Sequence, residues 1–243
     1  MKKSLILILI IIILLIGGFF LFKGKKETKM PEEKITMLEK AKGKKVVMII
    51  AFRDFRDKEY FVPKEILEKA GIEVKTASNK KGTAIGADGG DTEVDLLISE
   101  ISVSDFDAVI FVGGPGALEN LDNEDSYKVA KEAISQGKVL ASICISPVIL
   151  AKAGVLEGKK ATVWYSPLDK SSIKTLEEKG AIFEDQPVVV DGNIITANGP
   201  GAAEDFGKKI VVELKLVKKN FMTSVIVHIK IHMLLLKVVK IIH

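Results

Sequence analysis

The segment VLASICISPVILAKAGVL (Val139 to Leu156) passes from an apolar run, through the only cysteine of the chain, into a helical pattern that begins near Pro147. A side chain at such a junction is held on a tight turn, as in a nucleophile elbow. The N–H groups at the start of the following helix, together with the helix dipole, are expected to stabilise a thiolate and lower the pKa of Cys144. The alternative is a small buried hydrophobic residue, because free cysteine is among the most buried residue types.

Short β-branched runs alternate with helical patterns on both sides of this segment. The predicted strands are Val46–Phe52, Ile72–Ser78, Val94–Ile101, Asp107–Gly116 with its glycine turn, Ala161–Trp164 and the hairpin Pro187–Asn198. The first predicted helix ends at Gly71, and two more cover about 125–136 and 202–218. This alternation indicates an α/β fold with a flavodoxin-like parallel sheet sandwiched by helices.

The predicted topology brings two features to one edge of the sheet. In a parallel sheet the ligand crevice lies beyond the carboxyl ends of the strands, so Cys144 and the turn Gly113–Gly116 are expected to meet there. The turn lacks the glycine spacing and the lysine of phosphate-binding loops. It either serves only as a tight turn, or the N–H of Gly113 or Gly114 forms an oxyanion hole with that of Ile145.

The composition excludes several classes of protein. A single cysteine rules out a disulfide framework and a cysteine-rich zinc site. The net charge of +4 is modest, and Arg53 and Arg56 are the only arginines. Because nucleic-acid surfaces normally use arginine forks or interleaved aromatics, no nucleic-acid partner is expected. His228 and His232 have the i, i+4 spacing of metal ligands on a helix, but no carboxylate or cysteine lies near them in the sequence, so we expect no metal and no cofactor.

The two ends of the chain differ from its centre. The run from Leu5 to Phe22 is uncharged, is bracketed by lysines and is long enough to cross a bilayer. It lacks the small-residue cleavage site of a signal peptide. Lysines that follow it favour a cytoplasmic location for the rest of the chain, whereas the short basic amino terminus favours the opposite orientation. We therefore expect a single-pass transmembrane anchor over 1–23, a polar linker over 24–43, a domain over 44–219 and an apolar, basic tail of unknown role over 220–243.

Four ordered motifs carry a resemblance to a known family. They are DKEYFVPKEILEKAGIEV (Asp57 to Val74), FVGGPGALENL (Phe111 to Leu121), SICISPVILAKAGVL (Ser142 to Leu156) and ANGPGAAEDF (Ala197 to Phe206). Over residues 44–218 the chain resembles the ThiJ/PfpI family, within the class I glutamine amidotransferase-like superfamily. That family includes deglycases and intracellular proteases. Its members pair as homodimers or form larger homo-oligomers, so the resemblance implies the same here.

The resemblance assigns roles to three residues of the chain. Cys144 matches the elbow cysteine, Glu59 matches the buried glutamate that hydrogen-bonds the sulfur, and Gly114 matches the oxyanion-hole glycine. A carboxyl held beside a thiol and away from water has a raised pKa and can pass protons to and from the reacting atoms. The same carboxyl would stabilise a sulfinate if the thiol were oxidised.

The chain also departs from the family pattern. Family proteases carry a histidine directly after the cysteine, and here that residue is Ile145, which cannot act as a base. Deglycase-like members draw a histidine from the region after the next strand, where this chain offers Tyr165 and Ser166. Either hydroxyl can donate a hydrogen bond, but neither is a general base near neutral pH.

Several functions therefore stay open, and whether the chain is an enzyme is one of the open questions. The first hypothesis is an enzyme of reactive carbonyl compounds, glyoxalase- or deglycase-like and linked to stress response, with Cys144 as nucleophile and Glu59 as proton shuttle. The second is a non-enzymatic cysteine redox sensor. The third is a PfpI-type intracellular cysteine peptidase, which Ile145 weakens. The fourth is a membrane-tethered scaffold with a vestigial site.

Overall fold

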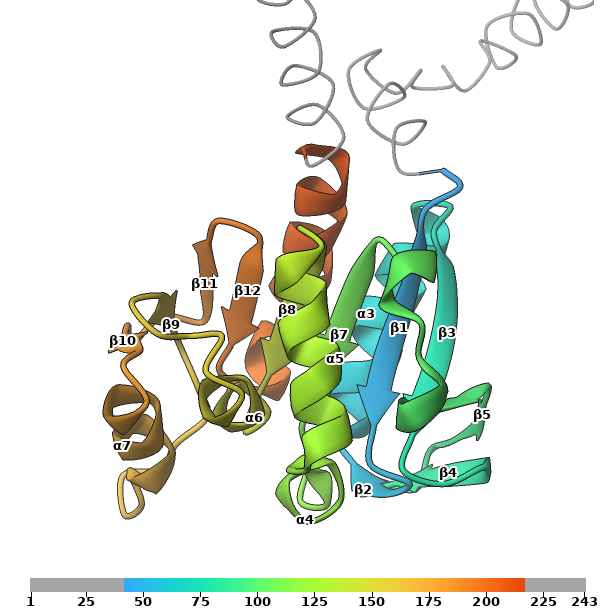
Figure 1. The fold of residues 1–243 in the computed structure, drawn as a ribbon. Coiled ribbons are helices and arrows are strands. Elements are labelled where there is room, and N and C mark those ends of the chain that lie inside the picture. The colour runs from blue at the N-terminus through green and yellow to red at the C-terminus, as the bar shows by residue number, and fades with distance from the viewer. Residues whose placement is uncertain (1–41, 217–243) are drawn as a thin grey trace, which may run out of the picture. The chain divides into compact units, whose positions relative to one another are not determined.

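The computed structural model describes residues 42–216, and within them a seven-stranded sheet forms the centre, in the order β11-β12-β8-β7-β1-β3-β6 (Figure 1). Its strands are β1 Lys45–Ile50, β3 Glu73–Ser78, β6 Leu96–Leu97, β7 Ala108–Phe111, β8 Val139–Ile143, β11 Val188–Asp191 and β12 Ile194–Ala197. All neighbouring pairs are parallel except β11 with β12. The predicted flavodoxin-like parallel sheet is thus confirmed.

Helices cover both faces of this sheet. They are α3 Asp57–Lys69, α4 Ala117–Leu121, α5 Glu124–Ser135, α6 Pro147–Lys152 and a last helix described over 203–216, whereas α7 Ser171–Glu178 packs on α6 and β10. On β1, Val47 and Ile49 pack in the core layer of α5 and α6, whereas Val46 and Met48 pack in that of α3 and the last helix. Strands buried on both faces read as continuous apolar runs, which is why these were visible in the sequence.

Smaller elements surround the sheet. They are the sheet of β2 Arg53–Phe55, β4 Gly82–Gly86 and β5 Asp91–Val94, the pair β9 Lys160–Ala161 with β10 Ile182–Phe183, and the 3₁₀ turns Ile98–Glu100, Val103–Asp105 and Pro200–Ala202. Neither the first small sheet nor α7 was predicted from the sequence. The predicted hairpin of β11 and β12 is confirmed, with Gly192 in the left-handed region at φ +64°.

The strand predicted over Val94–Ile101 is wrong for most of its length. β5 ends at Val94, β6 has only Leu96–Leu97, and a 3₁₀ turn follows. Ile98 and Ile101 are both buried in the layer of α5, and their i, i+3 spacing suits a tight helical turn rather than a strand. The Glu100 carboxylate accepts a hydrogen bond from the N–H of Leu97 at 2.8 Å, which closes that turn.

The predicted terminal segments lie almost entirely outside residues 42–216. The anchor at 1–23, nearly all of the linker at 24–43 and the tail at 220–243 fall among residues that the structure does not describe. Of the helices within 42–216, none combines the length and apolar character needed to cross a bilayer. The predicted anchor is therefore neither confirmed nor contradicted.

Candidate active site around Cys144

Cys144 lies at the sharp turn between β8 and α6. Its φ of +65° is in the left-handed region, which non-glycine residues seldom adopt and which is common at functional sites. Two backbone hydrogen bonds of 2.8 Å hold it there: its N–H donates to the carbonyl of Ala197, and its carbonyl accepts from the N–H of Trp164. The sulfur is thereby fixed at the carboxyl end of the sheet, with the residue 9% exposed.

Backbone donors face the sulfur from two loops. The N–H groups of Gly114 and Ile145 both lie within hydrogen-bonding reach of it and act to lower its pKa. Gly114 has a φ of +122°, and a Cβ there would lie 2.5 Å from the Asp54 carbonyl oxygen. Only glycine fits this position. The fold thus places the two N–H groups that were predicted to form an oxyanion hole, those of Gly114 and Ile145, beside the same sulfur.

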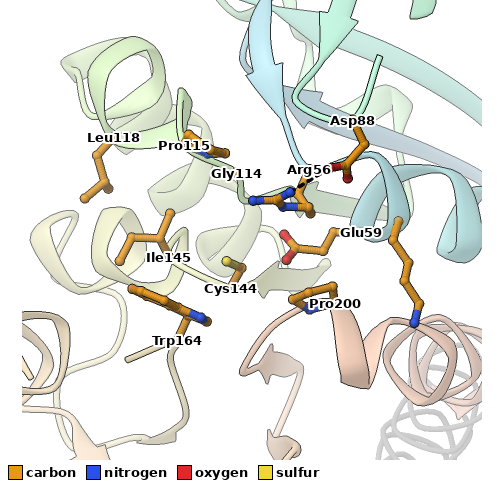
Figure 2. A pocket seen from close by; sticks show the side chains of 11 residues that line it. Arg56, Glu59, Asp88, Gly114, Pro115, Leu118, Cys144, Ile145, Trp164 and Pro200 are labelled. Atoms are coloured by element: carbon orange, nitrogen blue, oxygen red, sulfur yellow. Dashed lines mark hydrogen bonds and ion pairs between the residues drawn. The ribbon is translucent and has the colours of Figure 1, made fainter. Parts of the chain in front are cut away.

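The Glu59 carboxyl lies beside the thiol, and both point into the same space (Figure 2). Glu59 is fully buried in the first turn of α3. By geometry neither of its carboxyl oxygens has a hydrogen-bond partner among residues 42–216, although the Cys144 thiol and the Gly113 N–H are near enough to lower its pKa. Burial outweighs these contributions and raises the pKa of Glu59 to about 7. A carboxyl of this kind can exchange protons near neutral pH.

The expected lowering of the thiol pKa is wrong in direction. Burial raises the pKa of Cys144 to about 12, and the negative charge and hydrogen-bonding position of Glu59 add to the rise. The N–H groups of Gly114 and Ile145 act to lower the thiol pKa, but the effects that raise it are larger. Because the contribution of Glu59 depends on its charge, thiol and carboxyl titrate as one coupled pair. The resting pair is therefore a thiol beside a carboxyl, and a proton has to leave the sulfur as it reacts.

These groups open into a cavity of about 440 Å³. Its lining comprises Arg56, Lys58, Glu59, Asp88, Gly114, Pro115, Leu118, Cys144, Ile145, Trp164 and Pro200. A glycine at 113 keeps the centre open, since a Cβ there would lie 2.5 Å from the Cys144 Cβ and 2.7 Å from Oε2 of Glu59. The cavity therefore gives a small molecule access to both reactive groups.

Three charged residues of this lining, Arg56, Lys58 and Asp88, were not anticipated. Arg56 Nη1 donates to Asp88 Oδ1 at 2.9 Å. The loop that carries Asp88 is held by Asp57, whose carboxylate accepts the N–H of Asp88 at 2.8 Å and that of Gly90 at 2.6 Å. Arg56 was noted only as one of two arginines; its position three residues before Glu59, at the start of α3, was the signal for its place in the site.

The sequence profile described as DJ-1/PfpI family matches residues 44–213. The chain belongs to this family. A protein named Deglycase PfpI from Pyrococcus furiosus is 32% identical over 169 residues, covering 70% of this chain and 99% of that protein. An uncharacterized protein of Methanocaldococcus jannaschii is 43% identical over 183 residues, covering 75% of this chain and 86% of that protein. The crystal structure of a ThiJ/PfpI domain protein from Brachyspira murdochii superposes with a TM-score of 0.66 at 36% identity, covering 71% of this chain and 98% of that chain.

The two hydroxyl residues predicted as possible support of the site lie outside the cavity lining. The Tyr165 hydroxyl donates to Asp185 Oδ2 at 3.1 Å, and Ser166 forms a short turn with Asp169, so neither lines the cavity. Trp164 lines it instead, because its N–H is bonded to the carbonyl of Cys144 and the chain leads away from there. Its indole, 42% exposed, forms one wall of the cavity next to Ile145 (Figure 2).

The family domain shows no metal centre in the part that the structure describes. Residues 42–216 contain no group of three or more histidine, cysteine, aspartate or glutamate side chains suited to hold an ion. His228 and His232 lie outside the described residues. The reactive groups that line the cavity include the thiol of Cys144 and the carboxyl of Glu59.

Proposed function

We propose that this DJ-1/PfpI domain is a cysteine-dependent enzyme of small reactive carbonyl compounds, glyoxalase- or deglycase-like and linked to stress response. The observation that carries the proposal is the arrangement of the Cys144 thiol, the buried Glu59 carboxyl and the N–H groups of Gly114 and Ile145 around one open cavity. Relatives named deglycases, from Pyrococcus and Thermococcus, support it.

The first step is addition of the sulfur to an aldehyde. Anionic Glu59 accepts the thiol proton as the C–S bond forms and the carbonyl π electrons move to oxygen. The N–H groups of Gly114 and Ile145 stabilise the resulting oxyanion, and Glu59 then returns the proton to it. No free thiolate is required, so the raised thiol pKa is compatible with this step.

With a 2-oxoaldehyde such as methylglyoxal, the adduct then isomerises. Glu59 removes the proton from the former aldehyde carbon, giving an enediolate, and delivers it to the neighbouring carbon, while the hydroxyl proton on the former aldehyde oxygen moves to the neighbouring oxygen. The former aldehyde carbon is oxidised and its neighbour reduced, so no outside oxidant is needed. Water hydrolyses the resulting thioester, releasing lactate and the free thiol of Cys144.

A peptidase is less well supported by this site. Ile145 stands directly after the nucleophile, and the sequence has no histidine between 42 and 216. A cysteine–histidine pair of protease type is therefore lacking in the described domain. Addition to an aldehyde requires fewer catalytic groups than attack on an amide, because no amine leaving group has to be protonated.

Lactate formation from methylglyoxal by the full chain tests the proposal. We expect turnover that Cys144→Ala reduces by roughly 10³-fold or more, since the nucleophile is removed. A chain that produces no lactate, or a Cys144→Ala variant with full turnover, would show that the proposal is wrong. Casein hydrolysis that depends on Cys144 would instead revive the peptidase.

A redox sensor is the second candidate, and the unpartnered Glu59 carboxyl favours it. Peroxide oxidises a thiolate to a sulfenate with release of water, and a second peroxide gives the sulfinate, to which a protonated Glu59 can donate. Intact mass spectrometry after mild peroxide treatment should then show two added oxygens on Cys144. A thiol that stays unmodified under these conditions excludes the sensor.

We also propose that residues 1–23 anchor the chain in a membrane, with the domain in the cytoplasm, and that the chain forms a homodimer or larger homo-oligomer. Alkaline extraction of membranes should leave the anchored chain in the pellet, and light scattering of the detergent-solubilised chain should give a mass above that of one copy. A chain that is released by extraction or that runs as one copy contradicts the respective proposal.

A further inference from the structure

The cavity around Cys144 has two unlike walls. Arg56 and Asp88 lie on one side, together with Glu59, while Leu118, Ile145 and Trp164 lie on the other (Figure 2). The carboxyl and the thiol of the proposed reaction are at the bottom between them. Methylglyoxal has no charge to match the first wall; the charge of Arg56 acts to lower the pKa of Glu59, but the proposed reaction gives its remaining N–H donors no partner.

The guanidinium of Arg56 is held in place but has donors to spare. Within the described residues its side-chain hydrogen bond is the one to Asp88, at 2.9 Å. A guanidinium carries five N–H donors in a planar fork that matches a carboxylate. Figure 2 shows it extending over the cavity beside the Glu59 carboxyl. Asp88 thus orients the fork and leaves part of it free for a second carboxylate.

The balance of charge allows one more anion. Arg56 and Lys58 contribute two positive charges to the lining, and Asp88 contributes one exposed negative charge. Glu59 is buried and is the group assigned to proton transfer. While Glu59 is protonated, the lining thus carries one surplus positive charge that a ligand carboxylate beside Arg56 would compensate; with Glu59 anionic the four charges sum to zero.

The size of the cavity points the same way. At about 440 Å³ it lies within the range of about 300–1,000 Å³ that holds drug-sized ligands. Methylglyoxal has five heavy atoms and would leave most of this space to water. The apolar wall of Ile145, Leu118 and Trp164 would then have no contact with the substrate.

We infer that Arg56 is an anion-binding residue and that the substrate is a 2-oxoaldehyde bearing a carboxylate. The aldehyde lies against Cys144, the carboxylate binds the Arg56 guanidinium, and the carbon chain of the substrate joins the two. This assignment of substrate class rests on the proposed function, whereas the anion site itself can be tested without any turnover.

Alkylation of Cys144 by iodoacetate and by iodoacetamide tests the anion site. The two reagents differ in a carboxylate against an amide, and with one cysteine in the chain all alkylation is at Cys144. Each rate is divided by the rate for the urea-unfolded chain. We expect the normalised ratio of iodoacetate to iodoacetamide to be about 10 or more, as a charge-assisted hydrogen bond gives.

Three variants make this test specific. Arg56→Gln should bring the ratio to about 1, and Arg56→Lys, which keeps the charge and loses the fork, should keep at least about threefold preference. Arg53→Gln is the matched control, since Arg53 is exposed and outside the cavity lining. A ratio near 1 in the unaltered chain, or one that Arg56→Gln leaves unchanged, overturns the anion site.

Turnover of methylglyoxal and of 4,5-dioxopentanoate tests the substrate class. The unaltered chain should prefer the carboxylate-bearing compound in kcat/KM by about 10-fold or more, and Arg56→Gln should remove the preference. Equal kcat/KM for both compounds overturns the substrate class. Iodoacetate preference without turnover of either compound overturns the proposed function and leaves the anion site standing.

Discussion

Two carboxyl groups, at opposite ends of β7, have very different surroundings. Asp107 directly precedes the strand, and its carboxylate accepts Lys44 Nζ at 2.6 Å and the Lys45 N–H at 2.9 Å. Glu59 lies beside Gly113, just past the other end of the strand, fully buried and without a hydrogen-bond partner of good geometry among residues 42–216. The first arrangement is what a stable fold requires of a polar group; the second opposes stability.

The contrast separates the residues that hold the domain together from those that can react. At the amino end of the sheet, the Asp107 carboxylate is paired with the Lys44 side chain and the Lys45 N–H. At the carboxyl end the left-handed Cys144 and the unpaired Glu59 both raise the free energy of the folded state. Such local violations are expected at functional sites, where the rest of the fold compensates for them.

The largest expected effect is on turnover. Glu59→Gln keeps the shape of the side chain but removes proton transfer, so kcat/KM should fall by roughly 10²–10⁴-fold. The matched variant Asp107→Asn, at the other end of β7, should change kcat/KM by less than about threefold. Lactate assays of both variants check this. Comparable losses in the two would mean that the ends of the strand do not differ in function.

The next effect concerns stability against pH. The pKa of folded Glu59, about 7, lies above its ordinary value of 4.5. The folded chain thus holds this proton more tightly, and stability is lost as pH rises from about 4.5 to 7, by about 3 kcal/mol.

Glu59→Gln removes this titration, so it should become more stable relative to the unaltered chain as pH rises through that window. Urea unfolding of both full chains, followed by the fluorescence of the single tryptophan, Trp164, measures the difference. A difference that is the same at pH 4.5 and at pH 8 would contradict the raised pKa. Asp107→Asn serves again as the control for a carboxyl that is already paired.

A smaller effect is expected from closing the gap between thiol and carboxyl. Gly113→Ala places a methyl group 2.5 Å from the Cys144 Cβ, and such overpacking destabilises by about 1–3 kcal/mol. Gly201→Ala is the control, since a Cβ there meets nothing within 4 Å. We expect it to change stability by less than about 0.5 kcal/mol. Equal unfolding midpoints for the two variants would show that the centre of the site tolerates bulk.

The smallest effect is expected for Tyr165→Phe. Its hydroxyl binds Asp185 outside the cavity, so kcat/KM should stay within about twofold of the unaltered chain. A loss of 10-fold or more would restore Tyr165 as a supporting residue of the site, and would place the apolar wall of Trp164 in doubt.

The parts of this fold that could be predicted are those that depend on the local pattern of residues in the sequence. Strands that are buried on both faces appear in the sequence as continuous apolar runs. The turn at Cys144 is indicated because the apolar run of its strand ends just before Pro147. Glu59 came from the family resemblance, because an acidic residue at the start of a helix ordinarily faces solvent.

The remainder depends on contacts between distant residues. Arg56 and Asp88 are 32 positions apart, and Asp88 follows β4 in a sheet whose strands are too short to show a period. The choice of Trp164 over Tyr165 depends on where the chain leaves β9, which pairs over only two residues. The direction of the thiol pKa shift depends on burial, which no local pattern records.

The hydrogen bond from the Cys144 N–H to the Ala197 carbonyl has a consequence for evolution. Ala197 is the last residue of β12, whose partner β11 is the open edge of the sheet, where insertions and deletions are tolerated. A shift of β12 along β8, where Ala197 pairs with Ile143, would move the backbone to which the nucleophile is tied. Reactivity can thus diverge among relatives whose cavity residues are identical, through variation at a margin that touches no substrate.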